Sequence, residues 1–430
     1  MREDRVFAKC AWRLIPFMVV LYVVNFLDRV NVGFAALTMN KDLGFSPAVY
    51  GVGAGLFFAG YALCQVPANL ILKRVGARRW IFLILAVWGI LSISNAAISS
   101  PTSFYTLRFL LGVAEAGFFP GMIFYLTLWF PRSYRARFTA SFMTAVPLAN
   151  IIGAPVSSLI LEMNGTAALA GWQWLFLLEG LPACVLALAV LKLLPDGPGD
   201  AAWLLPAEQQ AIAARLGAED ATSHHSFVRA LRDPRVLALC PVGLGLSFGN
   251  YGVGLWLPQI VQSMGYANRA TGFIVAVPSL AGMVAMVLWG RSSDHHGERV
   301  KHVAAAALLA AVSLGIASMS GSNLAVLVAL TFATVGIYSA LPTFYSVPSM
   351  FLSGTAAAGG IALVNTFGTG LGGFLGPTVV GLLRQATGGY AAGMQALAVG
   401  LTLSATILLA LGYTGKGRLP QTTPVPESTL

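Results

Sequence analysis

Residues 12–38 read WRLIPFMVVLYVVNFLDRVNVGFAALT, an apolar run whose second half carries two adjacent charges, Asp28 and Arg29. A run of about 20 apolar residues can cross the hydrocarbon core of a bilayer as a helix. A charge at that depth costs roughly 3 kcal/mol even on lenient insertion scales, so such residues normally face a polar interior and have partners. This stretch therefore predicts a membrane-spanning helix that contributes charge to an internal site.

A second apolar stretch, 102–130, repeats the combination with Arg108 and Glu115. These two residues lie two turns apart on the same face of a helix, about 10 Å along its axis, which is too far for a direct pair unless the long side chains narrow the gap. Two carboxylates and two guanidiniums in one helix bundle form a site that could hold an organic anion and also bind a proton.

The composition agrees with a membrane protein. The chain has 430 residues, of which 57% are hydrophobic and only 10% charged, and its mean hydropathy is +0.76. Soluble domains carry about 25% charged residues. No cleavable signal peptide is evident, because the first apolar run is too long for one. The four cysteines fit no metal-binding spacing and are expected to be small core residues: Cys10, Cys64, Cys184 and Cys240.

Apolar stretches of suitable length divide the whole chain. They lie near residues 12–38, 48–72, 80–99, 102–130, 136–162, 172–194, 236–263, 268–290, 301–320, 323–350, 355–384 and 390–413. Many contain Gly or Pro, which membrane helices tolerate because neighbouring helices satisfy the freed backbone groups. The pattern predicts an all-α membrane protein with 12 transmembrane helices.

A polar interval separates the first six spans from the last six. We therefore expect an N-terminal six-helix bundle, a linker, a C-terminal six-helix bundle and a tail, at residues 1–194, 195–235, 236–415 and 416–430. The histidine pairs His224-His225 and His295-His296 lack cysteine or carboxylate ligands at metal spacing, except for Asp294 beside His295. We expect neither a metal site nor another cofactor.

The basic residues predict the orientation. Most Lys and Arg residues lie at the N-terminus, after the second, fourth and eighth spans, in the linker and in the tail, whereas the opposite loops carry only Lys41, Arg269 and Arg384. The positive-inside rule then places both termini, the linker and the tail in the cytoplasm. The net charge of +10 therefore reflects topology and contact with the lipid bilayer, and no nucleic-acid partner is expected.

The two halves look like repeats. RVGARR at 74–79 follows the second span, and DHHGER at 294–299 follows the eighth, so a short, charged, Gly-centred turn stands at the same place in each half. Internal duplication around a polar centre is typical of transporters, whose substrates bind near the bilayer midplane between the repeats.

Several segments resemble known families. GRSSDHHGER at 290–299 resembles the loop signature Gly-x-x-x-Asp-x-x-Gly-x-Arg of the major facilitator superfamily (MFS). Other segments resemble the anion:cation symporter family within it: FLDRVNVG at 26–33, RFLLGVAEAGFFPG at 108–121, NYG at 250–252, WLPQ at 256–259 and GGIALVN at 359–365. The resemblance covers nearly the whole chain. It implies the MFS fold and a multi-pass permease of the bacterial inner (plasma) membrane for a small carboxylate such as tartrate, phthalate, nicotinate or hydroxyphenylacetate.

The same resemblance implies cytoplasmic gating loops after the second and eighth spans. Their residues are Arg74, Gly76, Arg78, Gly290, Asp294, Gly297 and Arg299. The first-half copy departs from the signature, because Asn69 replaces the first Gly and Lys73 replaces the acidic residue.

Arg29 and Arg108 are the expected anchors for a carboxylate. A guanidinium pairs with a carboxylate through a planar fork of donors and stays charged at any accessible pH. The alternative is that each arginine only neutralises an acid nearby, Arg29 with Asp28 or Arg108 with Glu115. By resemblance, the matching arginines serve substrate binding and coupling.

Glu115 and Asp28 are the candidates for carrying a coupled proton. Burial favours the neutral form of a carboxyl group and a nearby cation favours the ionised form, so a group under both influences can respond when substrate occupies the cation. The alternative is a permanently ionised partner of an arginine. Glu179 is interpreted as a structural acid near the interface rather than a coupling group.

Uncharged polar and aromatic residues deep in the spans need hydrogen-bond partners, either on another helix or on a ligand. The candidates for substrate contact are Tyr61, Asn150, Asn250, Tyr251, Trp256, Tyr345 and Asn365. By resemblance, Tyr61, Asn150 and Asn365 match cavity-lining positions, and Tyr345 stands where related permeases often have Trp. No acid lies deep in the last six spans, so we expect charge chemistry in the first six spans and aromatic and amide contacts in the last six.

The leading hypothesis is a proton-coupled importer of a small mono- or dicarboxylate, a monomer that works by alternating access. An exchanger or facilitator of organic anions without obligatory proton coupling is the alternative within transport. A membrane sensor is a remote alternative, because the chain has no soluble output domain. No nucleophile–base or metal cluster points to an enzyme.

Overall fold

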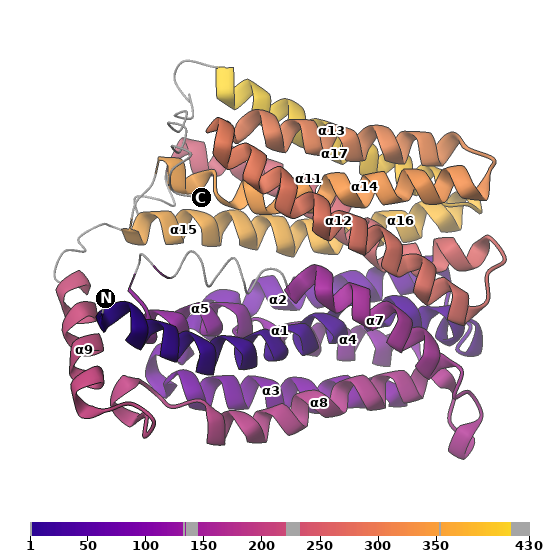
Figure 1. The fold of residues 1–430 in the computed structure, drawn as a ribbon. Helices are drawn as coiled ribbons and strands as arrows, with labels where there is room; N and C mark the ends of the chain where they lie inside the picture. Colours follow the sequence, from indigo (N-terminus) through magenta and orange to yellow (C-terminus); the bar gives the residue numbers. More distant parts are fainter. Residues whose placement is uncertain (1, 132–133, 135–144, 221–232, 352–353, 414–430) are drawn as a thin grey trace.

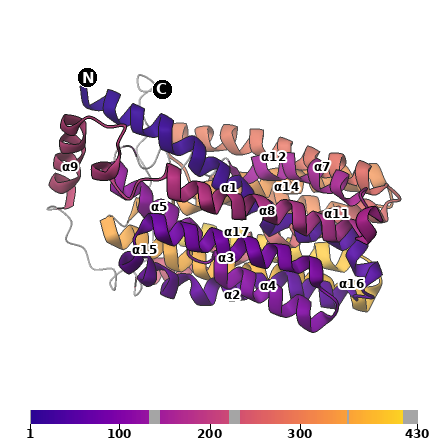
Figure 2. The same ribbon diagram turned by 90° about the horizontal axis from the view of Figure 1, so that it is seen from below.

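The computed structural model describes residues 2–131, 134, 145–220, 233–351 and 354–413. Within these residues the protein is helical, and Figure 1 shows two groups of helices, with α1 to α8 below and α11 to α17 above. Figure 2, seen from below, places α2, α3 and α4 in front of the second group. The first group is called the N-half and the second the C-half from here on.

The helices follow the predicted spans. Those of the N-half are α1 (Arg2–Asp42), α2 (Pro47–Val75), α3 (Ala77–Ser94), α4 (Pro101–Glu115), α5 (Phe118–Trp129), α7 (Ala145–Leu161) and α8 (Gly171–Leu193). The linker contains α9 (Pro206–Asp220). Those of the C-half are α11 (Pro234–Ser263), α12 (Asn268–His296), α13 (Val300–Met319), α14 (Asn323–Tyr345), α15 (Gly354–Asn365), the π-helical segment η5 (Thr366–Gly372), α16 (Gly373–Thr387) and α17 (Ala391–Tyr413).

Eleven helical stretches of the described chain are long and apolar enough to cross a membrane, and α7 is a shorter apolar helix. The predicted span 136–162 contains α7. The first part of that span, residues 136–144, lies outside the described residues. The all-helical architecture predicted from the sequence is confirmed. The exact boundaries of the two bundles, the linker and the tail stay a prediction.

Three of the spans begin with the same local signal. The side chains of Ser46, Ser100 and Asp233 each accept a hydrogen bond from a backbone N–H group in the first turn of α2, α4 and α11. A proline follows each of them, which suits the first helical position because that N–H group has no partner within the helix. These caps fix where the spans begin.

Two predicted spans are interrupted near their middle. The fourth breaks between α4 and α5, directly after Glu115, where Gly117 and Pro120 follow. The eleventh contains the π-helical segment η5, which begins directly after Asn365. Local departures from α-helical geometry are frequent at functional sites. Both interruptions therefore lie beside predicted site residues.

Hydrogen bonds between the two halves gather toward the end at which α1 and α11 finish. Asn40 donates to Gln259 at 3.3 Å, Gln262 donates to the carbonyl of Leu37 at 3.3 Å, and Tyr50 donates to the carbonyl of Leu255 at 2.8 Å. The charge distribution predicts that this end faces away from the cytoplasm. The halves are therefore joined at the expected outer end.

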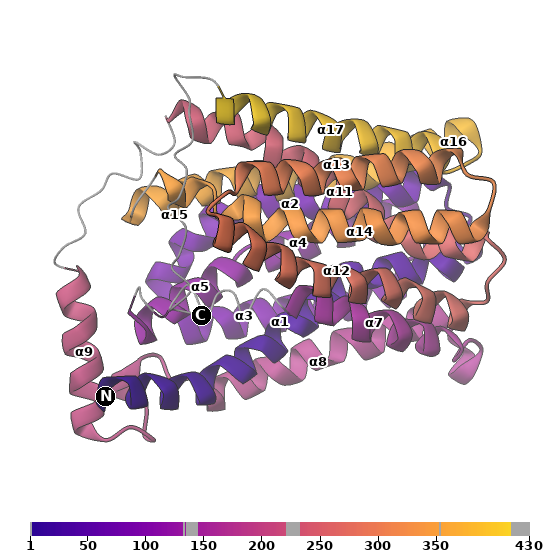
Figure 3. The same cartoon turned by 45° about the horizontal axis from the view of Figure 1, so that its top comes forward.

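The first part of the linker rests on the opposite end of the N-half. Lys9 lies 2.7 Å from Glu208 of α9, and the rings of Trp129 and Trp203 stack with their centres 5.6 Å apart. The hydrogen bond from Lys9 lowers the pKa of Glu208 below its ordinary value. Figures 1 and 3 both show α9 beside the N-terminus. This segment thus belongs physically with the N-half.

Candidate functional site

Arg29 and Glu115 form a buried ion pair between the first and fourth spans. Nη2 of Arg29 lies 3.0 Å from Oε2 of Glu115, and Nδ2 of Asn25 donates to the same oxygen at 2.8 Å. Asn25 precedes Arg29 by four residues, so both donors project from one face of α1. All three residues are buried. Within the described chain, Oε1 of Glu115 and Nε of Arg29 have no hydrogen-bond partner.

Asp28 lies in a different environment from its neighbour. Its carboxylate accepts hydrogen bonds from the indole of Trp88 at 2.6 Å, the hydroxyl of Ser92 at 2.7 Å and the amide of Asn31 at 3.2 Å. Trp88 and Ser92 belong to α3, so Asp28 joins α1 to α3. Arg29 therefore pairs with Glu115 rather than with Asp28, the acid next to it in sequence.

Arg108 is a fully buried guanidinium without a hydrogen-bond partner in the parts of the chain that the structure describes. Its side chain exposes no surface, and none of its three nitrogens has a partner among the described residues. It lies 5.0 Å from the ring centre of Phe57, and Arg29 lies 5.2 Å from the same ring. Cation–π contact offsets only part of the cost of burying a charge. Two cations thus flank one aromatic ring, and among the ion pairs of the described residues only Arg29 has a carboxylate partner.

Aromatic rings connect Arg29 to the C-half. The rings of Tyr61 and Phe57 lie 5.1 and 5.2 Å from the guanidinium. Phe57 meets Phe58 edge-on with ring centres 5.0 Å apart, and the ring of Tyr251 in α11 lies 4.1 Å from that of Phe58. The aromatic side chains around Arg29 therefore form a centre at the boundary between the two halves.

A pocket lies between the halves beside this centre. Three of the predicted contact residues line it, Asn150, Asn250 and Tyr251, together with Phe26 of α1 and Tyr338 of α14. Nδ2 of Asn150 approaches the hydroxyl of Tyr338 at 3.3 Å, so the pocket wall is itself a contact between α7 and α14. The other predicted contact residues do not line this pocket.

Asn365 and Tyr345 form a second polar group, which lies in the C-half. Oδ1 of Asn365 accepts hydrogen bonds from the hydroxyl of Tyr345 at 3.1 Å and from that of Thr369 at 2.9 Å. The three residues belong to α14, α15 and η5, so this group connects three elements of the C-half.

Trp256 takes part in packing toward the outer end. Its indole N–H donates to the carbonyl of Pro377 at 3.0 Å, its ring meets that of Tyr50 edge-on at 4.8 Å, and it is fully buried. Trp256 itself does not line the pocket, and its role in substrate binding stays a prediction.

The predicted gating loops share a backbone feature. Gly76 and Gly297 both have positive φ, 88° and 61°, a conformation that favours glycine at the end of a helix. In the first half, Arg78 bonds to the carbonyl of Leu191 and lies 3.9 Å from Asp196, whereas Arg74 is exposed.

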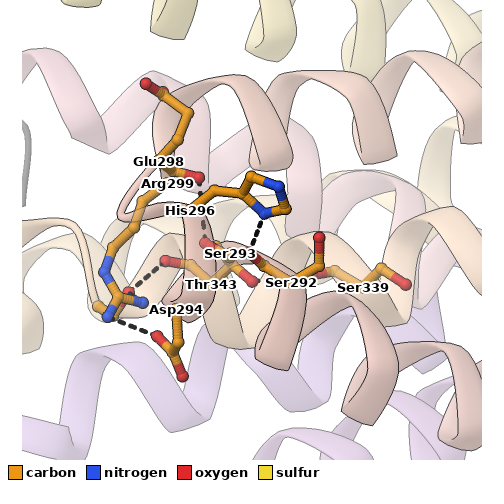
Figure 4. A network of polar contacts seen from close by, with 9 residues as sticks. Ser292, Ser293, Asp294, His296, Glu298, Arg299, Ser339 and Thr343 are labelled. Carbon is orange, nitrogen blue, oxygen red and sulfur yellow. Dashed lines mark hydrogen bonds and ion pairs between the residues drawn. The ribbon is translucent and has the colours of Figure 1, made fainter. Parts of the chain in front are cut away.

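The second-half loop is more extensively bonded (Figure 4). Arg299 pairs with Asp294 at 2.8 Å and donates to Ser346 at the end of α14 at 2.9 Å. Ser293 donates to the carbonyl of Glu298. Gly290 lies in α12, where an added Cβ would meet nothing within 4 Å. These contacts attach the turn that connects α12 and α13 to the end of α14. A gating role for both loops stays a prediction.

The structure adds site residues that the sequence interpretation omitted. Asn25 shares a carboxylate oxygen with Arg29, Phe57 lies beside both guanidiniums, and Thr369 bonds to Asn365. The helical spacing of four residues from Asn25 to Arg29 and from Asn365 to Thr369 is a usable signal. No sequence signal identifies Phe57 as a site residue, because an aromatic residue in an apolar span is typical of the hydrophobic core. In the described chain, no group of three His, Cys, Asp or Glu residues could hold a metal ion.

Comparisons with known proteins identify the family and the fold. The profile of the Major Facilitator Superfamily matches residues 18–377. A protein of Agrobacterium vitis named "Putative tartrate transporter" is 49% identical over 426 residues, which cover 98% of each chain. The "Inner membrane transport protein RhmT" of Escherichia coli K12 is 39% identical over 412 residues, 95% of each chain.

A solved structure shows the same fold. The bacterial homologue of the human lysosomal transporter Spinster, in an inward-facing and occupied conformation, superimposes with a TM-score of 0.77 and 16% identity, over 95% of this chain and 98% of that one. At this identity the likeness shows the fold alone. The profile match and the close relatives together show more: the protein is a multi-pass membrane transporter, not an enzyme, and it belongs to the Major Facilitator Superfamily.

Proposed function

We propose that this protein is a proton-coupled importer of a small organic anion, with a tartrate-like carboxylate as its substrate, in the bacterial inner membrane. The observation that carries the proposal is Arg108, a buried guanidinium beside the Arg29–Glu115 pair whose three nitrogens have no hydrogen-bond partner among the described residues. A buried cation is normally paired. A substrate carboxylate supplies the missing partner, and the name of the Agrobacterium vitis relative supports tartrate as the type of anion.

The shared use of Arg29 couples the anion to a proton. In the structure, Arg29 is bonded to the carboxylate of Glu115. Protonation of Glu115 removes the charge that holds Arg29, so the guanidinium becomes available to a substrate carboxylate. Conversely, a substrate carboxylate bound to Arg29 neutralises the positive charge that stabilises the ionised form of Glu115. Substrate binding therefore favours protonation of Glu115. Proton and anion therefore bind together, as a symporter requires.

Release on either side follows from movement of the two halves. The site lies between residues of α1 and α4 on one side and α11, α14 and α15 on the other. Opening toward the outside must break the contacts that Asn40 and Tyr50 make with α11. Rocking of one half against the other around a central site is the expected mode of alternating access.

Uptake into proteoliposomes tests this proposal. With the outside more acidic than the inside, the protein is expected to accumulate labelled tartrate, and a protonophore that collapses the gradient should remove the accumulation. The physical reason is that the anion enters with the proton that releases Arg29 from Glu115. Accumulation that ignores the pH gradient but requires an organic anion preloaded inside would contradict symport and favour the exchanger.

A further inference from the structure

Arg384 is a cation at the expected outer end of the molecule, and the ion pairs of the described residues give it no acid partner. It lies in the last turn of α16, and its side chain is only partly buried. The sequence predicts only two other basic residues at that end, Lys41 and Arg269. A cation that is rare on this side and not neutralised by an acid is a candidate for binding an anion.

Two aromatic rings hold the guanidinium of Arg384 in place. Its central carbon lies 4.3 Å from the ring centre of Tyr390, directly before α17, and 5.4 Å from that of Trp256. In addition, Nη1 of Arg384 donates to Oε1 of Gln259 in α11 at 3.1 Å. Contact with a ring stabilises a guanidinium without neutralising it. Arg384 is therefore fixed in position and keeps its full charge.

Polar atoms without partners lie in the residues that contact Arg384. Nε2 of Gln259 and the hydroxyl of Tyr390 are buried, and neither has a hydrogen-bond partner among the described residues. Both groups can donate a hydrogen bond. Buried polar groups are normally paired, so unpaired donors beside a cation indicate a ligand that accepts hydrogen bonds. A carboxylate has the required negative charge and acceptor oxygens.

Asn40 of α1 connects this group to the N-half. Its Nδ2 donates at 3.3 Å to Oε1 of Gln259, the same atom that accepts from Arg384. Opening toward the outside must break this contact, because Asn40 moves with the N-half. Arg384, Gln259 and Tyr390 all belong to the C-half and can stay together. Opening therefore exposes an intact group of donors.

We propose that Arg384, Gln259 and Tyr390 form an outer capture site, which binds a carboxylate of the incoming substrate before the central arginines do. The inference rests on the proposed function and adds a binding step for the same substrate. A fixed cation at the entrance raises the association rate, because it attracts the anion before contact. The alternative is that Arg384 only stabilises the end of α16, where a cation interacts favourably with the helix dipole.

Initial uptake of labelled tartrate into right-side-out membrane vesicles tests the capture site. At limiting tartrate the rate reports kcat/KM, and Arg384→Gln is expected to lower it about fivefold to tenfold at low ionic strength. Added salt should reduce kcat/KM of the parent much more than that of the variant, because salt screens the attraction. The maximal rate and the equilibrium Kd of tartrate should stay unchanged, because the central site is intact.

Two further variants separate capture from general charge and from folding. Arg269→Gln removes an exposed positive charge from the same end of the molecule and should leave kcat/KM nearly unchanged. Tyr390→Phe keeps the ring beside Arg384 and removes only the unpartnered hydroxyl, so kcat/KM should fall about twofold to threefold. If Arg384→Gln does not insert into the membrane, Tyr390→Phe provides the test.

Each outcome decides the inference. A lower unfolding temperature of Arg384→Gln, with unchanged kcat/KM and salt dependence, would show that Arg384 only stabilises α16. Equal losses of kcat/KM in Arg384→Gln and Arg269→Gln would reduce the effect to general surface charge. Either result would overturn the capture site and leave the proposed function standing. A parent protein that neither binds nor accumulates tartrate would remove both.

Discussion

Arg29→Lys is expected to weaken tartrate binding by about tenfold to a hundredfold, because hydrogen bonds to charged groups contribute about 1.5–3 kcal/mol. Lysine keeps the positive charge beside Glu115 but loses the planar fork that pairs with a carboxylate. The site around Arg29 suits the fork, since aromatic rings of Phe26, Phe57 and Tyr61 lie 5.1 to 5.4 Å from the guanidinium. The measurement is the dissociation constant of tartrate for purified protein, with insertion and thermal unfolding followed in parallel.

A matched control lies at the start of α11. Arg235 also pairs with an acid, Asp233 at 2.8 Å, and stacks on an aromatic ring, Phe351 at 4.3 Å. It is remote from the substrate site, so Arg235→Lys should leave tartrate affinity unchanged. Affinity of the Arg29→Lys variant within about twofold of the parent would count against Arg29 as the carboxylate anchor.

Glu115→Gln is expected to abolish gradient-driven accumulation while leaving binding and exchange intact. Arg29 and Asn25 both donate to one oxygen, Oε2, so glutamine retains an acceptor there and can place its NH₂ group at the position of the unpartnered Oε1. The variant mimics the protonated form permanently. Counterflow of labelled for unlabelled tartrate needs no net proton release and should continue, whereas uphill uptake should stop.

Glu179→Gln provides the comparison for Glu115→Gln. Glu179 is also a buried acid in the N-half, but it accepts from Ser157 at 2.6 Å and has no arginine partner among the described ion pairs. Gradient-driven uptake should therefore persist in that variant. Loss of binding and counterflow together in Glu115→Gln would mean that the carboxylate only supports Arg29. Retained accumulation would exclude Glu115 as an essential proton carrier and direct attention to Asp28.

Most of the fold could be predicted because hydrocarbon imposes length and apolarity on every span. The interruptions could be predicted only in part. Gly117 and Pro120 indicate a bend after Glu115, and the structure ends α4 there. The π-helical segment after Asn365 has no comparable signal, because Thr366–Gly372 consists of residues that also suit a close α-helical contact.

The residue types of the site could be predicted, but their pairing could not. Charge in an apolar span identifies Asp28, Arg29, Arg108 and Glu115 as site candidates. Which acid neutralises which cation depends on the rotation of each helix, and neighbouring residues point in directions about 100° apart. Asp28 therefore faces α3 while Arg29 reaches Glu115 of α4. Sequence spacing alone contains no information on such contacts between helices.

If the buried guanidiniums bind a carboxylate, binding must depend on the charge of the ligand. Equilibrium binding to the parent protein measures this dependence with tartrate and with its neutral diamide, which keeps the size and both hydroxyls. Tartrate is expected to bind, and the diamide neither to bind nor to compete, because Arg108 and Arg29 require a negative charge. Equal binding or equal competition by the diamide would show that the guanidiniums do not hold a carboxylate.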